Sequence, residues 1–407
     1  MAILSVLGGA FMTPKTQWYR SMVSRIPIPD RYAFPFSHPY GAATKIRVWV
    51  HGASAGEWET LIPIVERMSD GSIEWIMTTF SRSGLSSVQK FSNELAGKNE
   101  SVIYAGLSPR EGDWLKALTL MKPKFCMTAK YEAWPEWWMS LNELSIPLVI
   151  IQTQWRSSLA TAKGVLTTFL CPLPKLYLNT PMGKDTEIRK HFPDADVFPT
   201  FDPRKDRIRD RMIEREAQTV EKLKPAINLP KPWGVLGSVW PSDLPILMNV
   251  LKKTKDTIWV VPHDLSTKNL DKIMSYLPSD LTVIWSKWSD RKIEAPQFII
   301  VDQFGWLAEL YSLASWAYVG GGFGQGIHST LEPGVLGVPV SSGPKRVAEF
   351  SETEWLSAQN ILTIVKKPKD FELWRESLTI SDAKRSFTEI EGGTQKVVDW
   401  IKEKLWK

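Results

Sequence analysis

The sequence is poor in the residues that form metal and redox sites. Its 407 residues include two cysteines, Cys126 and Cys171, and five histidines. The cysteines lie far apart and match no metal-ligand or redox spacing, and the histidines form no cluster along the chain. We therefore predict that the protein binds no metal ion and works in a reducing, cytosolic compartment.

Long hydrophobic runs are also missing. The opening residues, MAILSVLGGAFM, are mostly apolar, but so short a segment cannot cross a bilayer. It also lacks the basic region of a signal peptide. The segment is either an anchor at the membrane interface or a terminus that packs or frays, and both interpretations stay open. No other stretch approaches the length of a membrane span, and no internal repeat is found.

Positive charge and tryptophan, in contrast, are abundant. The formal net charge is +6, and the chain has 20 tryptophans. A basic surface favours an anionic partner such as a nucleotide, a membrane surface or a nucleic acid, although an ordinary solvated surface can have the same composition. Tryptophan suits membrane interfaces and stacking on sugars, and it also fills cores. Composition therefore favours an anionic ligand without identifying it.

Short β-rich runs alternate with helix-length segments along the chain, which predicts βαβ units with parallel sheets. A chain of this length is expected to form two domains. We predict an α/β protein with one doubly wound domain at residues 1–195 and a second at 233–407, whose last helix is free to pack back on the first domain. A charged helix and a proline-rich stretch make 196–232 a linker region. The predicted strands are IRVWV, SIEWIMTT, SVIYAG, FCMTA, PLVIIQT and KLYLN in the first half, and GVLGS, DTIWVVP, LTVIWS, FIIVD, WAYVGG and VPVSSG in the second.

Doubly wound sheets bind ligands beyond the carboxyl ends of their strands, so the turns at these ends are the candidate sites. The run IRVWV leads into VHGASAGE, where small residues precede Glu57. A carboxylate in the first turn of a helix is favoured by the helix dipole whatever its function. The dipole does not account for the small residues, which would let a substrate approach the backbone closely. We interpret Glu57 as a candidate general base for a sugar hydroxyl.

Two further turns of the first half contain polar and aromatic residues. In TTFSRSG, Ser81 or Ser83 could simply cap the following helix. In KYEAWPEWW, Glu132 is followed by Trp134 and two more tryptophans. These residues are either core with a charge at the surface, or a platform for a sugar or a lipid.

Two turns of the second half indicate an anionic ligand. GSVWPSD is a Gly-Ser turn that enters a helix and offers free backbone N–H groups and a hydroxyl to an anion. YVGGGFGQGIHSTLEP has five glycines directly after a predicted strand. It resembles a dinucleotide-binding turn, but no acidic residue ends the next strand. The pattern favours a nucleotide phosphate or ribose over NAD, with Glu332 placed to bind ribose hydroxyls.

These segments, in this order, resemble the 3-deoxy-D-manno-octulosonic acid (Kdo) transferases of lipopolysaccharide synthesis, over roughly residues 45–365. VHGASAGE is similar to the H-x-x-S-x-G-E block of that family, TTFSRSG to its T-T-x-T-x-T-G turn, KYEAWPEWW to its E-x-W-P segment and FDPRKDRI to its linker motif. GSVWPSD, VVPHDL, DQFGWLAELY and GGGFGQGIHSTLEPGVLGVPVSSGP are similar to its nucleotide-side blocks. The chain departs from the family at Ser329, where asparagine is usual, at Phe201, where glycine is usual, and at MAILSVLGGAFM, which stands in place of a membrane helix.

The resemblance implies a GT-B glycosyltransferase, with two Rossmann-like domains that face an interdomain cleft. It implies an inverting transfer of Kdo from CMP-Kdo to a lipid A precursor, without metal or other cofactor, and with Glu57 as catalytic base. The acceptor-binding candidates are Ser54, Gly56, Thr79, Ser81, Glu132, Trp134 and Arg156. The candidates that bind the CMP donor are Gly237, Ser238, His263, Phe304, Gly305, Gly322, Gly326, Ser329 and Glu332. The enzyme would attach peripherally to the anionic cytoplasmic face of the bacterial inner membrane, and it would bind no nucleic acid.

Two other functions stay open. The first is another GT-B glycosyltransferase with a different sugar nucleotide or acceptor, which assays with CMP-Kdo and UDP-sugars would separate. The second is a non-catalytic protein that binds nucleotides or nucleic acid, for which binding would fall steeply with salt. This second function leaves the small residues before Glu57 unexplained.

Overall fold

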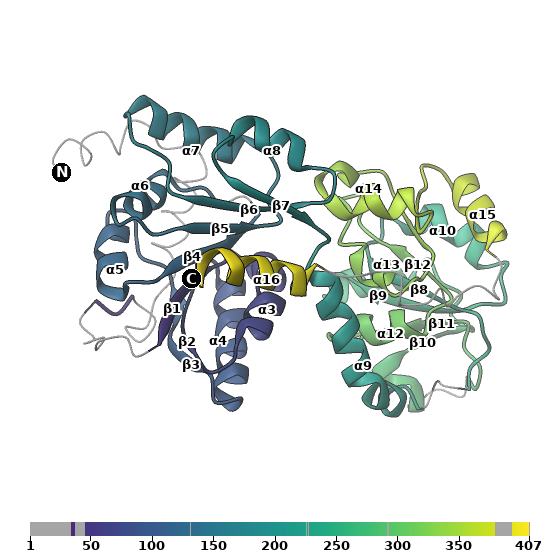
Figure 1. Cartoon of the computed structure of the whole chain (residues 1–407). Helices are drawn as coiled ribbons and strands as arrows, with labels where there is room; N and C mark the ends of the chain where they lie inside the picture. Colours follow the sequence, from purple (N-terminus) through teal and green to yellow (C-terminus); the bar gives the residue numbers. More distant parts are fainter. Residues whose placement is uncertain are drawn as a thin grey trace. The chain divides into compact units, whose positions relative to one another are not determined.

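The computed structural model describes residues 34–36, 45–130, 132–224, 226, 228–290, 293–378 and 393–406. The opening segment MAILSVLGGAFM, for which a membrane anchor is one prediction, lies outside these residues. The chain divides into two compact units, and the first comprises residues 1–204 together with 392–407. The second comprises residues 205–391. Figure 1 shows a parallel sheet with helices on both faces in each unit.

The first unit is built on a parallel sheet of seven strands in the order β3-β2-β1-β4-β5-β6-β7. The order reverses between β1 and β4, which makes this point the switch point of a doubly wound sheet. The strands are β1 (Ile46–His51), β2 (Ile73–Thr79), β3 (Ser101–Leu107), β4 (Phe125–Ala129), β5 (Leu148–Ile151), β6 (Leu176–Pro181) and β7 (Asp196–Thr200).

Helices cover both faces of this sheet because the side chains of a strand alternate between its two faces. One face packs against α3 (Ala55–Met68), α4 (Arg82–Gly97) and α16 (Thr394–Leu405). The other packs against α5 (Trp114–Met121), α6 (Pro135–Glu143), α7 (Ser157–Thr168) and α8 (Asp185–His191).

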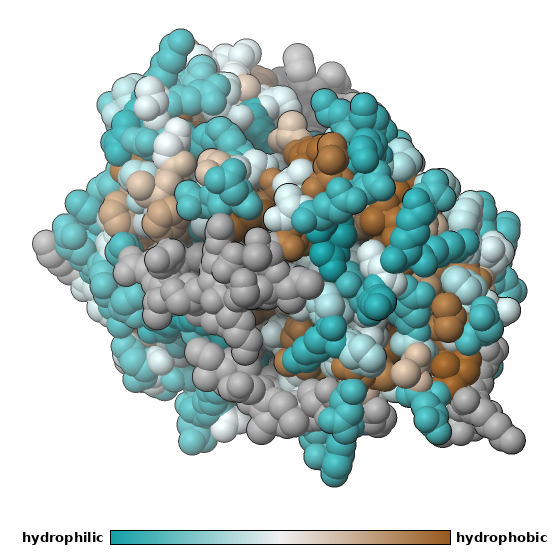
Figure 2. Space-filling model, turned by 90° about the vertical axis from the view of Figure 1, so that its right-hand side faces the viewer, coloured by the Kyte–Doolittle hydropathy of each residue, from teal (hydrophilic) through white to brown (hydrophobic). Residues whose placement is uncertain are grey.

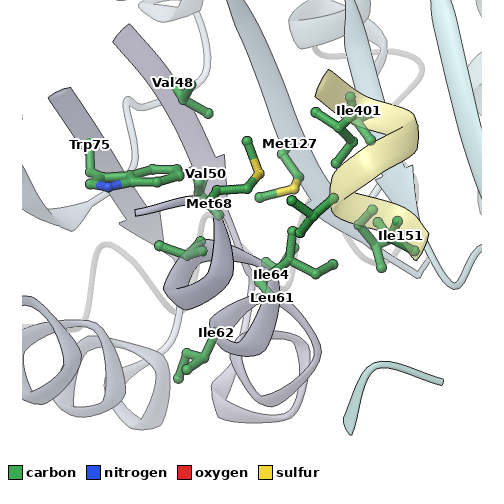
Figure 3. Close-up of a cluster of buried hydrophobic side chains, with 14 of the residues drawn as sticks. Val48, Val50, Leu61, Ile62, Ile64, Met68, Trp75, Met127, Ile151 and Ile401 are labelled. Atoms are coloured by element: carbon green, nitrogen blue, oxygen red, sulfur yellow. The ribbon is translucent and has the colours of Figure 1, made fainter. Parts of the chain in front are cut away.

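The last helix, α16, contributes to the core of the first unit. In the close-up of Figure 3, Ile401 of α16 lies near Met127 and Ile151 of the sheet, with Leu61 and Ile64 of α3 beside them. All five side chains are buried. Apolar area removed from water stabilises by about 25 cal/mol per Å², so this shared core holds the chain's end on the first unit.

The second unit repeats the plan with a parallel sheet in the order β10-β11-β9-β8-β12-β13-β14, whose switch point lies between β8 and β12. The strands are β8 (Trp233–Val239), β9 (Thr257–Pro262), β10 (Thr282–Ile284), β11 (Phe298–Ile300), β12 (Trp316–Val319), β13 (Val340–Ser342) and β14 (Leu362–Ile364). The helices are α9 (Arg204–Lys222), α10 (Leu244–Leu251), α11 (Thr267–Met274), α12 (Leu307–Leu313), α13 (Leu331–Val335), α14 (Ser351–Ala358) and α15 (Pro368–Ser377), with short 3₁₀ helices η2 (Trp285–Asp290) and η3 (Val347–Glu349).

The predicted fold class, two Rossmann-like doubly wound units, is confirmed. The predicted boundaries at 195 and 233 differ in detail from the division that the contacts give. The change of unit follows Arg204, inside the segment expected to be a linker, and that segment contains β7 and the whole of α9.

Tryptophan serves mainly as core in both units. Among the described residues, eight tryptophans are almost completely inaccessible to water: Trp49, Trp58, Trp75, Trp137, Trp138, Trp233, Trp259 and Trp316. On the face shown in Figure 2, hydrophilic residues are mixed with small groups of hydrophobic ones. No helix within the described ranges is long and apolar enough to cross a membrane.

Candidate functional site

The candidate acceptor residues of the first unit lie on four neighbouring turns. The strands β2, β1, β4 and β5 are adjacent and parallel, so their carboxyl ends share one edge of the sheet. Ser54, Gly56 and Glu57 follow β1, Thr79 ends β2 and Ser81 follows it, Glu132 and Trp134 follow β4, and Arg156 follows β5. The structure thus brings all of these predicted residues to one edge, with Glu57 and Glu132 at the switch point.

Glu57 lies in the first turn of α3, where the helix dipole favours its negative charge. The spacing of Ser54 and Glu57 is that of a capping box, but Ser54 makes no side-chain cap to the helix backbone. Its hydroxyl donates instead to the Glu57 carboxylate. Glu57 is half-buried, so its carboxylate is oriented by a neighbour and remains partly accessible to a substrate.

The two glycines of this turn differ in whether the fold requires them. A Cβ on Gly52 would lie 2.9 Å from Cδ1 of the buried Trp58, so this glycine is required by packing. A Cβ on Gly56 would meet only the Ser54 hydroxyl, at 3.7 Å. Gly56 is exposed, and it does not have the positive φ that favours glycine. Neither packing nor conformation therefore requires Gly56, although glycine destabilises a helix relative to alanine.

Thr79 and Ser81 hold the neighbouring turns together. The Thr79 hydroxyl and the Ser81 backbone N–H both donate to the carbonyl of Ala53, at 3.2 and 3.1 Å. The Ser81 hydroxyl is the N-cap of α4 and accepts from the Gly84 N–H at 3.0 Å. The capping interpretation of Ser81 therefore describes its geometry, and any contact with an acceptor would be additional.

The aromatic segment after β4 divides into core and surface. Trp137 and Trp138 are buried in the core. Trp134 is half-buried, and its indole N–H donates to the Glu132 carboxylate at 2.8 Å. A ring centroid separation of 5.2 Å places it edge-on against Phe80. Of the predicted platform, only Trp134 and Glu132 are thus partly accessible.

His51, the last residue of β1, lies beneath this edge and is completely buried. Its Nδ1 is 3.0 Å from the Thr78 hydroxyl, and its ring centroid is 4.4 Å from that of Phe80. Burial lowers the pKa of His51 to about 3. A neutral, enclosed ring cannot take a proton from an acceptor in this turn, whereas the carboxylates of Glu57 and Glu132 are both partly accessible.

The candidate donor residues of the second unit also share one edge. The strands β11, β9, β8 and β12 are adjacent and parallel. Gly237 and Ser238 end β8, His263 follows β9, Phe304 and Gly305 follow β11, and Gly322, Gly326, Ser329 and Glu332 follow β12. All the residues predicted to bind the donor thus lie at the carboxyl ends of four neighbouring strands.

The end of β8 is strained and closely packed. Ser238 has a φ of 51°, a left-handed conformation that costs a residue other than glycine about 1–2 kcal/mol. The register between β8 and β9 shifts at this position. A side chain on Gly237 would collide with the buried Tyr311 hydroxyl. Strain of this kind persists only where surrounding structure enforces it, and it is common at ligand sites.

Asp243 is the main polar residue that the sequence motifs did not single out. Its buried carboxylate accepts from the Trp240 N–H and the Gly321 N–H, both at 2.9 Å, and from the Tyr318 hydroxyl at 3.1 Å. Burial raises its pKa, and the backbone hydrogen bonds oppose this rise. Asp243 therefore links the turn after β8 to the glycine-rich turn after β12. In the sequence, Asp243 is the last residue of the motif GSVWPSD, and nothing in that motif indicates that its carboxylate is buried.

At each glycine of the turn after β12, the structure of the chain itself explains why glycine is present. Gly321 and Gly326 have φ values of 94° and 118°. Side chains on Gly320 and Gly322 would strike the backbone of Ser238 and Gly343, and one on Gly324 would lie 2.6 Å from the Ser242 hydroxyl. The many glycines led the sequence analysis to predict a ligand here, but backbone conformation and packing between turns explain them. The contact of Gly322 and Gly326 with a donor stays a prediction.

Three rings stand together at the same edge. The centroid of His263 lies 4.9 Å from that of Trp240 and 4.1 Å from that of His328, with nearly parallel planes in the second pair. The indole N–H of Trp240 donates to Nε2 of His328 at 3.2 Å. His263, a predicted donor residue, is exposed. It therefore stacks with two residues, Trp240 and His328, that the sequence did not predict as donor residues.

The remaining predicted donor residues differ in exposure. The Ser329 hydroxyl donates to the Glu352 carboxylate at 3.0 Å. Glu332 is half-buried, and its charge contributes, after burial, to the raised pKa of Tyr311. Phe304 is 82% exposed, which is unusual for a large aromatic side chain and leaves its ring available for stacking.

Comparison with known proteins shows which family the chain resembles. Residues 27–173 match the family model described as 3-deoxy-D-manno-octulosonic-acid transferase (kdotransferase). Relatives with the name 3-deoxy-D-manno-octulosonic acid transferase have 25% identity in Chlamydophila psittaci, over 76% of this chain and 72% of the relative, and 26% in Chlamydia muridarum, over 85% and 81%. The relative of that name in Aquifex aeolicus is 26% identical over 75% of this chain and 80% of its own length. The chain thus resembles the Kdo transferases over about three quarters or more of its length. It is therefore a glycosyltransferase, as the sequence motifs predicted.

Solved structures support the fold assignment. The UDP-GlcNAc 2-epimerase of Methanocaldococcus jannaschii superimposes with a TM-score of 0.59 at 13% identity, over 88% of this chain and all of that one. The MurG protein of Acinetobacter baumannii gives a TM-score of 0.51 at 11% identity, over 88% of this chain and 99% of its own. At such low identity the likeness concerns the GT-B fold alone.

Proposed function

We propose that the protein transfers Kdo from CMP-Kdo to a lipid A precursor with inversion at the anomeric carbon, and that Glu57 is the general base. The observation that supports this most is the turn after β1. It holds an accessible carboxylate at the switch point, next to a glycine that the fold does not require. Similarity to Kdo transferases supports the sugar that is transferred.

The proposed step breaks one bond and forms another. An acceptor hydroxyl gives its proton to the Glu57 carboxylate as its oxygen attacks the anomeric carbon of Kdo. The bond from that carbon to the phosphate oxygen breaks, and CMP leaves with the bonding electron pair. A positioned general base contributes about 10²- to 10⁴-fold to such a rate.

The second unit has suitable groups for the nucleotide. Backbone N–H groups in tight turns favour anions, and Lys345 adds an exposed positive charge whose ammonium donates to the Gly324 carbonyl. We assign the ribose hydroxyls to Glu332, because a carboxylate accepts hydrogen bonds from them, and base stacking to Phe304. This arrangement needs no metal ion, so we expect full activity in the presence of a chelator.

The first unit has suitable groups for the acceptor. Trp134 offers a partly exposed aromatic surface for a sugar ring, and Arg156, half-buried after β5, offers a charge for an anionic group. Since the acceptor is a membrane lipid, we further propose peripheral attachment to the anionic cytoplasmic face of the inner membrane. Positive net charge supports attraction to such a surface.

Mass spectrometry of a lipid A precursor incubated with the protein and CMP-Kdo tests this function. The proposal predicts an acceptor whose mass increases by one or more Kdo residues, with CMP released. Parallel reactions with UDP-sugars test whether the donor is CMP-Kdo or another sugar nucleotide. Transfer from a UDP-sugar, without transfer from CMP-Kdo, would show that the donor assignment is wrong.

A further inference from the structure

His328 is held by its neighbours on one side and open on the other. The Cδ2 atom of its ring faces the glycine-rich turn, since a Cβ on Gly321 would lie 3.3 Å from it. The adjacent Nε2 accepts the indole N–H of Trp240 at 3.2 Å. The remaining nitrogen, Nδ1, has no hydrogen-bond partner in the part of the chain that the structure describes. The ring is half-buried rather than enclosed.

The partner on Nε2 determines where the ring proton lies. An indole N–H is a donor only, so Nε2 of His328 must be an acceptor without a proton of its own. A neutral imidazole has one N–H, which is then on Nδ1. Burial, followed by the charge of His263, lowers the pKa of His328 to about 4. At neutral pH the ring is therefore neutral, and Nδ1 is its single donor.

We propose that Trp240 is a positioning residue that fixes His328 in the Nδ1–H tautomer, so that this N–H is presented to an anionic oxygen of the sugar nucleotide. The oxygen would belong to the phosphate or to the sugar carboxylate, which have the same hydrogen-bond chemistry. The identity of the ligand rests on the proposed function, whereas the tautomer is a property of the free protein.

The reason for a separate positioning residue is the two-fold choice that an isolated imidazole has. Without a donor on Nε2, the proton distributes between the two nitrogens, and only one tautomer can donate from Nδ1. Apparent affinity falls in proportion to the fraction of protein in the competent state. His263, stacked on the His328 face at 4.1 Å, restrains the ring plane but cannot select the tautomer.

Side-chain ¹⁵N NMR of the full-length protein tests the proposal directly. Wild type is compared with Trp240→Phe, which keeps an aromatic ring against His263 but removes the N–H. Trp288→Phe is the matched control, because its indole N–H donates to the Ile293 carbonyl at 3.0 Å in the same unit. His328→Phe identifies the His328 signals.

The expected result is a protonated Nδ1 and an unprotonated Nε2 on His328 in wild type and in Trp288→Phe. Trp240→Phe should show a mixture of tautomers, and CMP should bind about two- to fivefold more weakly, by the factor that the measured Nδ1–H fraction predicts. A protonated Nε2 in wild type, or an unchanged tautomer in Trp240→Phe, would overturn the assignment of Trp240.

Ligand titrations on the same samples separate the two sources of the oxygen. A shift of the His328 Nδ1–H signal with CMP or inorganic phosphate supports the phosphate, and a shift with free Kdo alone supports the carboxylate. If CMP binds elsewhere without shifting this signal, and Kdo and phosphate also leave it unchanged, the ligand contact of His328 is wrong. If CMP does not bind at all, the proposed donor is wrong, and the tautomer result in the free protein still decides the role of Trp240.

Discussion

Replacing Gly56 with alanine should make the protein more stable and less active. The new Cβ would have a single neighbour, the Ser54 hydroxyl at 3.7 Å, which is ordinary van der Waals contact. Glycine in a helix costs about 0.5–1 kcal/mol relative to alanine. Gly56→Ala should therefore raise the free energy of unfolding by up to about 1 kcal/mol, less if the first turn is already frayed.

Activity should move in the opposite direction if an acceptor approaches the backbone beside Glu57. A methyl group at the reacting hydroxyl displaces it by about 1 Å, and displacement of this size can cost about 10²-fold in rate. The assays are denaturant unfolding and the initial rate of Kdo transfer.

Gly164→Ala is the matched control. Gly164 is an exposed glycine inside α7, and a Cβ there would meet nothing within 4 Å beyond the backbone of its own helix. This variant should gain similar stability and keep the full transfer rate. Gly52→Ala should instead lose stability, since its Cβ would press on Trp58. Unchanged transfer by Gly56→Ala would refute the explanation of this glycine by substrate approach.

Three further predictions concern the donor site, pH and the membrane. Glu332→Ala should weaken CMP binding about 10- to 100-fold in calorimetry, because charged hydrogen bonds contribute about 1.5–3 kcal/mol each; unchanged binding would exclude the ribose role. Because the pKa of His51 is lowered from 6.5 to about 3 in the folded state, its contribution to stability is complete above pH about 6.5 and is lost as the pH falls toward 3. The free energy of unfolding should therefore be about 3 kcal/mol lower at pH 4 than at pH 7 because of this group. In His51→Gln, this part of the pH dependence should be absent. Finally, the protein should sediment with anionic vesicles at low salt and be released by about 0.5 M NaCl without detergent; release by detergent alone would mean that a part of the chain inserts deeply.

Most of the fold could be predicted because strands buried on both faces read as short apolar runs. The two strands that the pattern missed, β7 and β14, both lie at the edges of their sheets. β7 contains Pro199, which edge strands tolerate, and lies in the segment expected to be a linker. β14 has one buried residue among its three, whereas the equally short β11 and β13 are buried throughout. Because β7 was not recognised as a strand, the end of the first unit was predicted at residue 195, before Arg204, where the contacts place it.

The position of the candidate site could be predicted from the turns, but its internal contacts could not. Strand order decides which turns are neighbours, and no local pattern of residues encodes that order directly. Asp243 and Trp240 were visible only as parts of a motif, because their roles depend on hydrogen bonds to Gly321 and His328, about 80 to 90 residues further along the chain. The five glycines after β12 suggested a ligand, whereas close contacts between turns account for them.

The role of Glu57 as the base is tested most directly by the single-turnover rate of Kdo transfer in Glu57→Gln, with CMP-Kdo and a lipid A precursor. Glutamine keeps the size of the side chain and its hydrogen bond with Ser54 but cannot accept the proton. We predict a rate at least about 100-fold below that of wild type, with CMP affinity nearly unchanged. Glu59→Gln, which removes a carboxylate two residues further along α3, should retain the wild-type rate. A Glu57→Gln protein that transfers Kdo as fast as wild type would contradict the assignment of Glu57 as the base.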